Sequence, residues 1–185
     1  GIFYMRDFSQ AKEIKKWSEE VEDVTIIGTG FIGLEFASSF SQLGKKVSVL
    51  VRSGKPLEKV LGSDMANYFT KMHQAHGVNF LFDEEADEEG YLMSEELQKF
   101  IKDDQGKISS ILTKSGKKIK SDMVLIAVGV EPNLSFDIEG LDIDGGVIVN
   151  EYGESSLEGI YAGGDLAVWP YKGRLVHIEH WEVAW

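Results

Sequence analysis

Three glycines, Gly28, Gly30 and Gly33, have the spacing in this sequence that points most directly to chemistry. They match G-x-G-x-x-G, in which the first glycine permits a tight turn, the second lets the backbone approach a pyrophosphate, and the third lets a helix pack closely on a strand. The amides and positive dipole end of a helix starting there would face the phosphates. The spacing predicts a dinucleotide-binding loop; the alternative is that these glycines only let a helix pack.

The sequence on either side supplies the strand and the helix that such a loop needs. Residues 24–27 form a β-branched run that is typical of a strand buried on both faces in a parallel sheet. From Ile32 the apolar residues recur at helical spacing as far as Leu43, and Gly44 ends the helix. Residues 47–51 predict a second buried strand. The whole stretch is therefore a βαβ unit, which connects in the right-handed sense.

The end of that second strand indicates which nucleotide would bind. An acidic residue about 20 positions after the first glycine normally bonds the ribose hydroxyls of NAD. Here the residue is Val51, followed by Arg52, Ser53 and Lys55. Guanidinium and ammonium groups pair with phosphate, so the sequence favours NADPH. The alternative is that these are ordinary solvated loop charges.

The rest of the first 129 residues completes a sheet. A continuous apolar strand is predicted at 123–129, and the acidic run at 83–90 reads as a solvated insertion. Alternating residues broken by turns at 104–106 and 115–116 predict a small antiparallel meander. The remaining predicted elements are strands at 2–5 and 78–82, a helix at 8–20, and a helix from Ser63, as N-cap, to Ala75.

In the last 40 residues the sequence predicts short elements, but no further strands follow with which they could form a sheet. A short strand is expected at 160–162, a helix start at Leu166, and a loop over 171–174. We therefore expect an internal piece of a longer protein. Exposed Trp169, Trp181 and Trp185 would then favour self-association into a homo-oligomer.

Composition excludes several classes of function. The 185 residues include 31 acidic and 19 basic side chains, a net charge of −12, which argues against nucleic acid or an anionic membrane as partner. There is no cysteine, so this stretch has no disulfide, thiolate zinc site or cysteine nucleophile. His73 and His76 read as helix residues rather than metal ligands. No apolar run approaches the ~18 residues of a membrane span.

Three segments together carry a family resemblance. VTIIGTGFIGLEFASSFSQLGKKVSVL, MVLIAVGVEPN and IYAGGDLA resemble the pyridine-nucleotide:FAD oxidoreductases, in the branch of apoptosis-inducing factors and ferredoxin reductases. The resemblance implies a NAD(P)H-binding domain at 1–149 and a partial FAD-binding segment at 150–185. It implies an α/β fold: a Rossmann-like parallel sheet with helices on both faces, a small antiparallel β crossover, and an incomplete return to an FAD domain.

The resemblance also implies roles for individual residues. Near the nicotinamide dinucleotide it places Gly28, Gly30, Phe31, Ile32 and Gly33 along the pyrophosphate, Glu35 at the nicotinamide end, and Gly129 close to the dinucleotide. In the flavin part it places Asp165 on the ribityl chain and Glu179, His180 and Trp181 beside the isoalloxazine ring. Glu35 could instead pair with a lysine on its helix face, and Asp165 could simply form a turn.

The resemblance implies a reaction as well. A hydride passes from NAD(P)H to FAD, and the electrons go singly to an acceptor of the ferredoxin, Rieske or quinone type; no side chain need act as acid or base. Two alternatives stay open: a flavin disulfide reductase, and a non-catalytic redox sensor like the apoptosis-inducing factors. The location, in the cytoplasm or the mitochondrion, also stays open.

Overall fold

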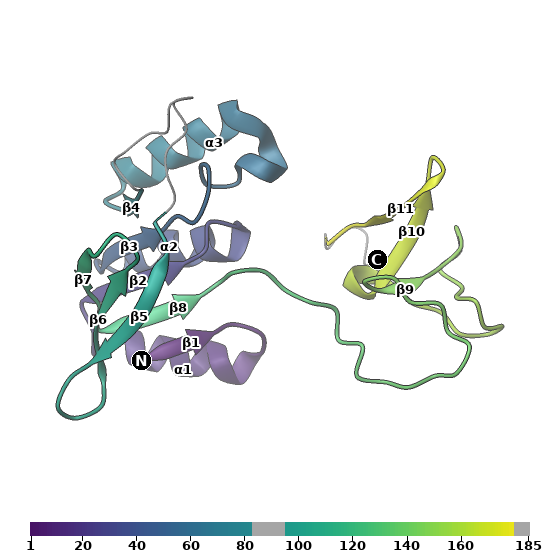
Figure 1. Ribbon diagram of the computed structural model, residues 1–185, viewed down its shortest axis with the longest axis horizontal. Helices are drawn as coiled ribbons and strands as arrows, with labels where there is room; N and C mark the ends of the chain where they lie inside the picture. Colours follow the sequence, from purple (N-terminus) through teal and green to yellow (C-terminus); the bar gives the residue numbers. More distant parts are fainter. Residues whose placement is uncertain (83–94, 180–185) are drawn as a thin grey trace. The chain divides into compact units, whose positions relative to one another are not determined.

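The computed structural model describes residues 1–82 and 95–179, in two compact units (Figure 1). Unit 1 is Gly1–Gly129 and unit 2 is Val130–Trp185. The sequence led us to expect a division at 149/150, so the observed division falls earlier. The reason is packing: Leu134 and Phe136 lie against the core of unit 2, beside Val147. The acidic run at 83–90 lies outside the described residues.

A five-stranded parallel sheet forms the centre of unit 1. Its strand order is β1-β8-β2-β3-β4, and every neighbouring pair is parallel. The strands are β1 (Ile2–Tyr4), β2 (Asp23–Ile27), β3 (Lys46–Leu50), β4 (Asn79–Leu81) and β8 (Met123–Ile126). The central strands are buried on both faces, which explains their continuous apolar sequence. The predicted Rossmann-like parallel sheet is confirmed.

Three helices cover one face of this sheet. They are α1 (Phe8–Ser18), α2 (Phe31–Gln42) and α3 (Glu58–Ala75). Ile14 of α1, Phe40 of α2 and Phe69 of α3 all pack on one apolar core with alternate residues of the strands. The apolar periodicity of the helices is therefore satisfied by this single face.

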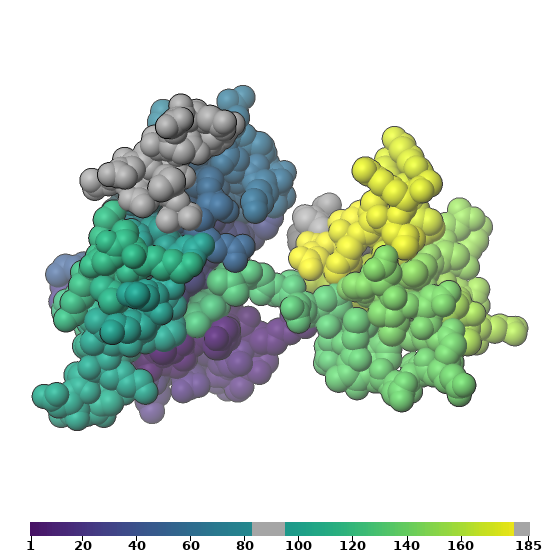
Figure 2. Space-filling model, in the orientation of Figure 1, coloured from purple at the N-terminus to yellow at the C-terminus, as the bar shows by residue number. Residues whose placement is uncertain are grey.

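A small antiparallel sheet covers the other face. It contains β5 (Leu97–Lys102), β6 (Ile108–Thr113) and β7 (Lys118–Lys120) in consecutive order, as the alternating pattern predicted. Ile108 and Ile111 pack against Leu50 and Val124 of the parallel sheet. The space-filling view shows this sheet in teal at the surface of unit 1 (Figure 2). We expected helices on both faces; in the described part the second face carries β5, β6 and β7 instead.

Helix α3 consists of two helical segments that meet at Gly62, whose φ of +77° is not helical. The longer segment follows Gly62, which agrees with the expected start near Ser63, whereas the short segment that begins at Glu58 was not expected. The residue before the helix, Leu57, has a φ of +60°, a conformation that branched side chains rarely adopt. Its amide donates to the carbonyl of Thr29 at 3.1 Å. The short segment at Glu58 is therefore preceded by a residue that a tertiary main-chain contact holds, and no side chain caps it.

Unit 2 is built around a three-stranded sheet. Its strands β9 (Val147–Ile148), β10 (Ala167–Tyr171) and β11 (Arg174–His177) have the order β11-β10-β9. The expected helix start at Leu166 is wrong: a single 3₁₀ turn, η1 (Gly164–Leu166), leads directly into β10. Residues 167–171 include Val168, Trp169 and Tyr171, which are residue types that favour strands, and burial falls from Ala167 to Tyr171.

Two other expectations for this unit are corrected. The loop expected at 171–174 is a tight hairpin, in which Lys172 and Gly173 both have positive φ, as a two-residue turn between antiparallel strands requires. The strand expected at 160–162 is reduced to one bridge between Tyr161 and Glu154. Trp169 is half-buried against the core of the unit; Trp181 and Trp185 lie outside the described residues.

In the described ranges, 1–82 and 95–179, none of the helices combines the length and the apolar character needed to cross a lipid bilayer.

Candidate functional site

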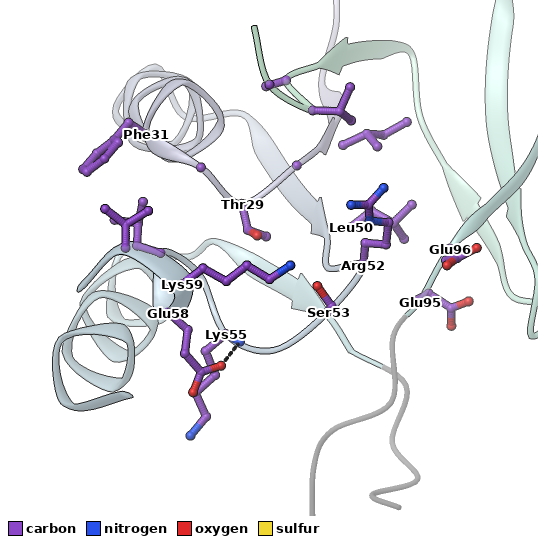
Figure 3. Close-up of a pocket in the computed structure, with 18 of the residues that line it drawn as sticks. Thr29, Phe31, Leu50, Arg52, Ser53, Lys55, Glu58, Lys59, Glu95 and Glu96 are labelled. Carbon is purple, nitrogen blue, oxygen red and sulfur yellow. Dashed lines mark hydrogen bonds between the residues drawn. The ribbon is translucent and has the colours of Figure 1, made fainter. Parts of the chain in front are cut away.

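A pocket of unit 1, with a volume of about 450 Å³, opens beyond the carboxyl ends of β8, β2 and β3. Four segments form its wall: the loop after β2, the connection from β3 to α3, the residues after β8, and the start of β5 (Figure 3). Ligands of open parallel sheets bind at this edge, where the strand order reverses. Of the predicted residues, the pocket brings together Gly28, Gly30, Phe31, Arg52 and Gly129.

Two glycines of the loop are required by close packing. Gly28 has a φ of +121°, and a Cβ there would collide with the carbonyl of Ala127. A Cβ on Gly33 would collide with the carbonyl of Gly28. Gly33 is buried and does not line the pocket, so its function is to let α2 pack on the loop.

Two other glycines leave room for a ligand. A Cβ on Gly30 or on Gly129 would meet no atom within 4 Å, and both residues line the pocket. The backbone of Gly30 is extended, with φ −78° and ψ −175°, which any residue can adopt. Its lack of a side chain is therefore not required by the fold. The space that a side chain would fill is the space in which a phosphate could contact the backbone.

The start of α2 adds a favourable electrostatic field. Gly30 is the N-cap, it offers no capping side chain, and no acidic residue lies in the first turn. The first amides of α2, those of Phe31 and Ile32 included, therefore lack side-chain acceptors from the cap, and the positive end of the helix dipole points into the pocket. Together with Gly30 and Gly129, this arrangement fits a pyrophosphate.

Cationic side chains gather at the other end of the pocket, beyond β3. Arg52 and Ser53 follow the strand, and Figure 3 shows the side chain of Lys59 extending over the pocket toward them. The ammonium of Lys55, which the sequence placed beside Arg52, instead donates to Oδ1 of Asn67 at 2.6 Å. The second cation directed at this end is Lys59, which the sequence analysis missed because it expected α3 to begin at Ser63.

A buried carboxylate, Glu95, closes the wall on the side of β5. Its side chain is 1% exposed and accepts a hydrogen bond from Oγ of Ser115 at 2.7 Å, with Nζ of Lys117 at 3.5 Å. Burial raises the pKa of Glu95, but the hydrogen bonds from Ser115 and Thr113 and the charge of Lys117 outweigh it, so that this pKa lies below its usual value. The Glu95 carboxylate is therefore ionised, and its charge is already paired with Ser115 and Lys117.

The remaining predicted residues lie elsewhere. Ile32 and Glu35 are on α2 but do not line the pocket, and Glu35 is exposed. In unit 2, Asp165 is exposed in η1, and Glu179 is exposed after β11. The main-chain oxygen of Asp165 lies 2.6 Å from Nε2 of His177. His180 and Trp181 lie outside the described residues, so the structure does not test their predicted roles.

The sequence matches the family model described as pyridine nucleotide-disulphide oxidoreductase over residues 1–185. Rhodocoxin reductase of Rhodococcus erythropolis is 31% identical over 182 residues, which cover 97% of this chain and 40% of that protein. Human apoptosis-inducing factor 3 is 27% identical over 190 residues, which cover 100% of this chain and 29% of that protein. The chain thus spans less than half the length of these relatives.

A solved structure gives the same result for the fold. The covalent putidaredoxin reductase-putidaredoxin complex contains a chain that is 25% identical and superposes with a TM-score of 0.86, over 99% of this chain and 42% of that one. The family resemblance drawn from the three sequence segments is therefore confirmed.

Proposed function

Because the chain belongs to the pyridine nucleotide-disulphide oxidoreductase family, we propose that the whole protein is an FAD-dependent NAD(P)H oxidoreductase that delivers electrons to a small acceptor. The acceptor we propose is an iron–sulfur protein of the ferredoxin or Rieske type, or a quinone. The names of the similar proteins, rhodocoxin reductase and putidaredoxin reductase, support a redox protein over a quinone.

The observation that supports this proposal most strongly is the open backbone of the pocket at Gly30 and Gly129. Gly30 and Gly129 leave open space at the start of α2, where the helix dipole favours a pyrophosphate. The nicotinamide supplies a hydride and the flavin accepts it, so the protein's task is to bind and orient the two cofactors. The residues of unit 1 would fix the dinucleotide through its phosphates, and no side chain of the pocket is required as acid or base.

We propose that the nucleotide is NADPH at least as readily as NADH. Val51 offers no carboxylate to a ribose diol, and Arg52 and Lys59 both border the end of the pocket where a 2′-phosphate would lie. A charge-assisted contact to phosphate contributes about 1.5–3 kcal/mol before the cost of ordering the loop. One good contact is therefore enough for a roughly tenfold preference, about 1.4 kcal/mol.

We propose that unit 2 contributes to the flavin site. The carboxylate of Asp165 is exposed and has no hydrogen bond within the described residues, so it is available for the flavin ribityl chain. Glu179, His180 and Trp181 would lie beside the isoalloxazine ring. These assignments rest on the family pattern.

The test uses the full-length protein, purified and mixed anaerobically with NADPH or NADH while the flavin absorbance is followed. We expect bound flavin that is bleached by the nucleotide and recovers when a ferredoxin-type protein or a quinone is added. Flavin that binds but is never reduced would contradict the proposal and favour a redox sensor. Turnover only with a disulfide substrate would favour a disulfide reductase.

A further inference from the structure

The charges around the pocket are not equally available to a ligand. Lys55 is bonded to Asn67, and Oε2 of Glu58 accepts the main-chain amide of Lys55 at 2.9 Å, as the dashed line in Figure 3 shows. Glu95 is held by Ser115 and Lys117. Arg52, Lys59 and Glu96 are the other charged residues that line the cavity. All six charges contribute to the field at this end, because a hydrogen bond to a neutral group does not cancel a charge. Among the carboxylates, Glu96 is the one whose pKa is influenced by the charge of Arg52.

A main-chain contact places Glu96 beside Arg52. The amide of Glu95 donates to the carbonyl of Val51 at 2.9 Å, which fixes the start of β5 against the last residue before Arg52. Within the described part of the chain, Arg52 forms no ion pair within 4 Å. Arg52 and Glu96 thus influence each other through the field, without a contact that would neutralise either one.

Lys114 restrains Glu96 from its other side. The main-chain amide of Lys114 donates to the carbonyl of Glu96 at 2.8 Å, and its ammonium pairs with Oε2 of the Glu96 carboxylate. The hydrogen bond and charge of Lys114, and then the charge of Arg52, lower the pKa of Glu96, so the carboxylate stays ionised near neutral pH. Glu96 is partly exposed, which means that its effect on the pocket is screened but not abolished.

We infer that Glu96 is a specificity-determining residue that weakens the binding of NADPH relative to NADH, and that Lys114 moderates it by pairing with its carboxylate. The inference rests on the proposed function, because it requires the 2′-phosphate to lie beside Arg52. Val51 offers no carboxylate at the end of its strand, and Glu96, the residue before β5, supplies a negative charge near that end instead. Such a site uses both nucleotides instead of selecting NADPH strictly.

Removing Glu96 and removing Lys114 should change the affinity for the 2′-phosphate in opposite directions. A phosphate monoester carries about −1.5 to −2 charges at pH 7, so it is repelled by Glu96, whereas a ribose diol is neutral. Removing one carboxylate across a solvated gap should raise the affinity for the 2′-phosphate about threefold at low salt. Removing Lys114 exposes the charge of Glu96 and should lower that affinity by about twofold to threefold.

The experiment measures dissociation constants of the full-length protein by calorimetry, with adenosine 2′,5′-bisphosphate and with adenosine 5′-monophosphate as probes. Glu96→Gln should bind the bisphosphate about threefold more tightly and Lys114→Met about twofold to threefold more weakly, with the monophosphate nearly unchanged in both. High salt should reduce both effects. Glu22→Gln, which removes an exposed carboxylate from a lysine pair outside the pocket, is the matched control and should change neither constant.

Equal changes for the two probes, or no change in either variant, would overturn the inference about Glu96 while leaving the nucleotide site intact. A wild-type protein that binds neither probe would instead contradict the proposed function. An Arg52→Ala variant separates a third outcome: unchanged binding of the bisphosphate would show that the 2′-phosphate does not lie beside Arg52, and the inference would fail for that reason.

Discussion

The two ends of the pocket are built in different ways. At the glycine loop the wall is backbone, fixed by collisions that any side chain on Gly28 or Gly33 would produce. Beyond β3 the wall includes the charged side chains of Arg52 and Lys59, which are exposed, and of Glu96, which is partly exposed. A backbone site is rigid and binds what every dinucleotide shares, whereas exposed charges are adjustable and can distinguish a diol from a phosphate. Substitutions in the glycine loop should therefore impair folding or the binding of both nucleotides. Substitutions of the charged residues beyond β3 should change the preference between NADPH and NADH.

The largest expected effect is on the stability of the backbone end. Gly28→Ala should lower the free energy of unfolding by about 3 kcal/mol, because it combines an unfavourable φ with a collision against the carbonyl of Ala127. Gly44→Ala is the control, since its φ is +73° but its Cβ would meet no atom within 4 Å; it should cost about 1 kcal/mol. Urea denaturation measures both, and equal costs would remove the evidence for a sterically fixed loop.

Arg52→Ala tests the selective end. It should lower kcat/KM for NADPH about tenfold, corresponding to about 1.4 kcal/mol, and leave kcat/KM for NADH nearly unchanged. Arg6→Ala removes another exposed arginine, outside the pocket, and should affect neither nucleotide. Steady-state kinetics at matched ionic strength decide the matter. An equal loss for both nucleotides, or a clear NADH preference in the wild type, would mean that Arg52 is only a solvated loop charge.

The two lysines of the β3–α3 connection should differ. Lys59→Ala should weaken NADPH binding about threefold without loss of stability, because its side chain extends over the pocket. Lys55→Ala should leave NADPH binding almost unchanged and cost about 1 kcal/mol of stability, because it removes the hydrogen bond to Asn67. Binding titrations and thermal unfolding of the two variants give the answer. The reverse ranking would show that Lys55, as the sequence alone suggested, is the phosphate ligand.

A smaller expected effect is the pH dependence of folding stability that arises from His73 of α3. Burial, and then the charge of His76, lowers the pKa of His73, which packs edge-on against Phe80. The unfolded chain therefore binds this proton more readily than the folded one, and stability should fall as the pH drops below about 6.5, by at most about 1.4 kcal/mol per pH unit. His73→Leu should flatten this slope, whereas His76→Gln should largely keep it. An unchanged slope in His73→Leu would show that another group titrates.

Much of the fold could be predicted because it is encoded locally. The buried strands, the glycine loop with α2, and the antiparallel strands β5 to β7 each have their own periodicity and turn residues. The strands β10 and β11 were missed because the glycines before Asp165 resemble a helix start, and only the pairing of Val168 with His177 makes the segment a hairpin.

The selective end of the pocket could not be predicted in the same way, because tertiary contacts create it. A short helical segment begins at Glu58, next to Leu57, whose amide bonds to Thr29, and this segment puts Lys59 in the wall of the pocket. Glu96 reaches the same wall through the bond from Glu95 to Val51. Neither contact leaves a pattern in the sequence.

The central claim is that the backbone at Gly30 is open because a dinucleotide phosphate occupies that space. Gly30→Val tests it directly, since Gly30 is extended and a Cβ there would meet no atom of the protein within 4 Å beyond its chain neighbours. Calorimetric titration of the full-length protein with NADPH and NADH, together with its Tm, is the measurement. We predict an unchanged Tm and at least a tenfold loss of affinity for both nucleotides, about 1.4 kcal/mol or more. A variant that keeps its Tm and binds both nucleotides as tightly as the wild type would contradict the account.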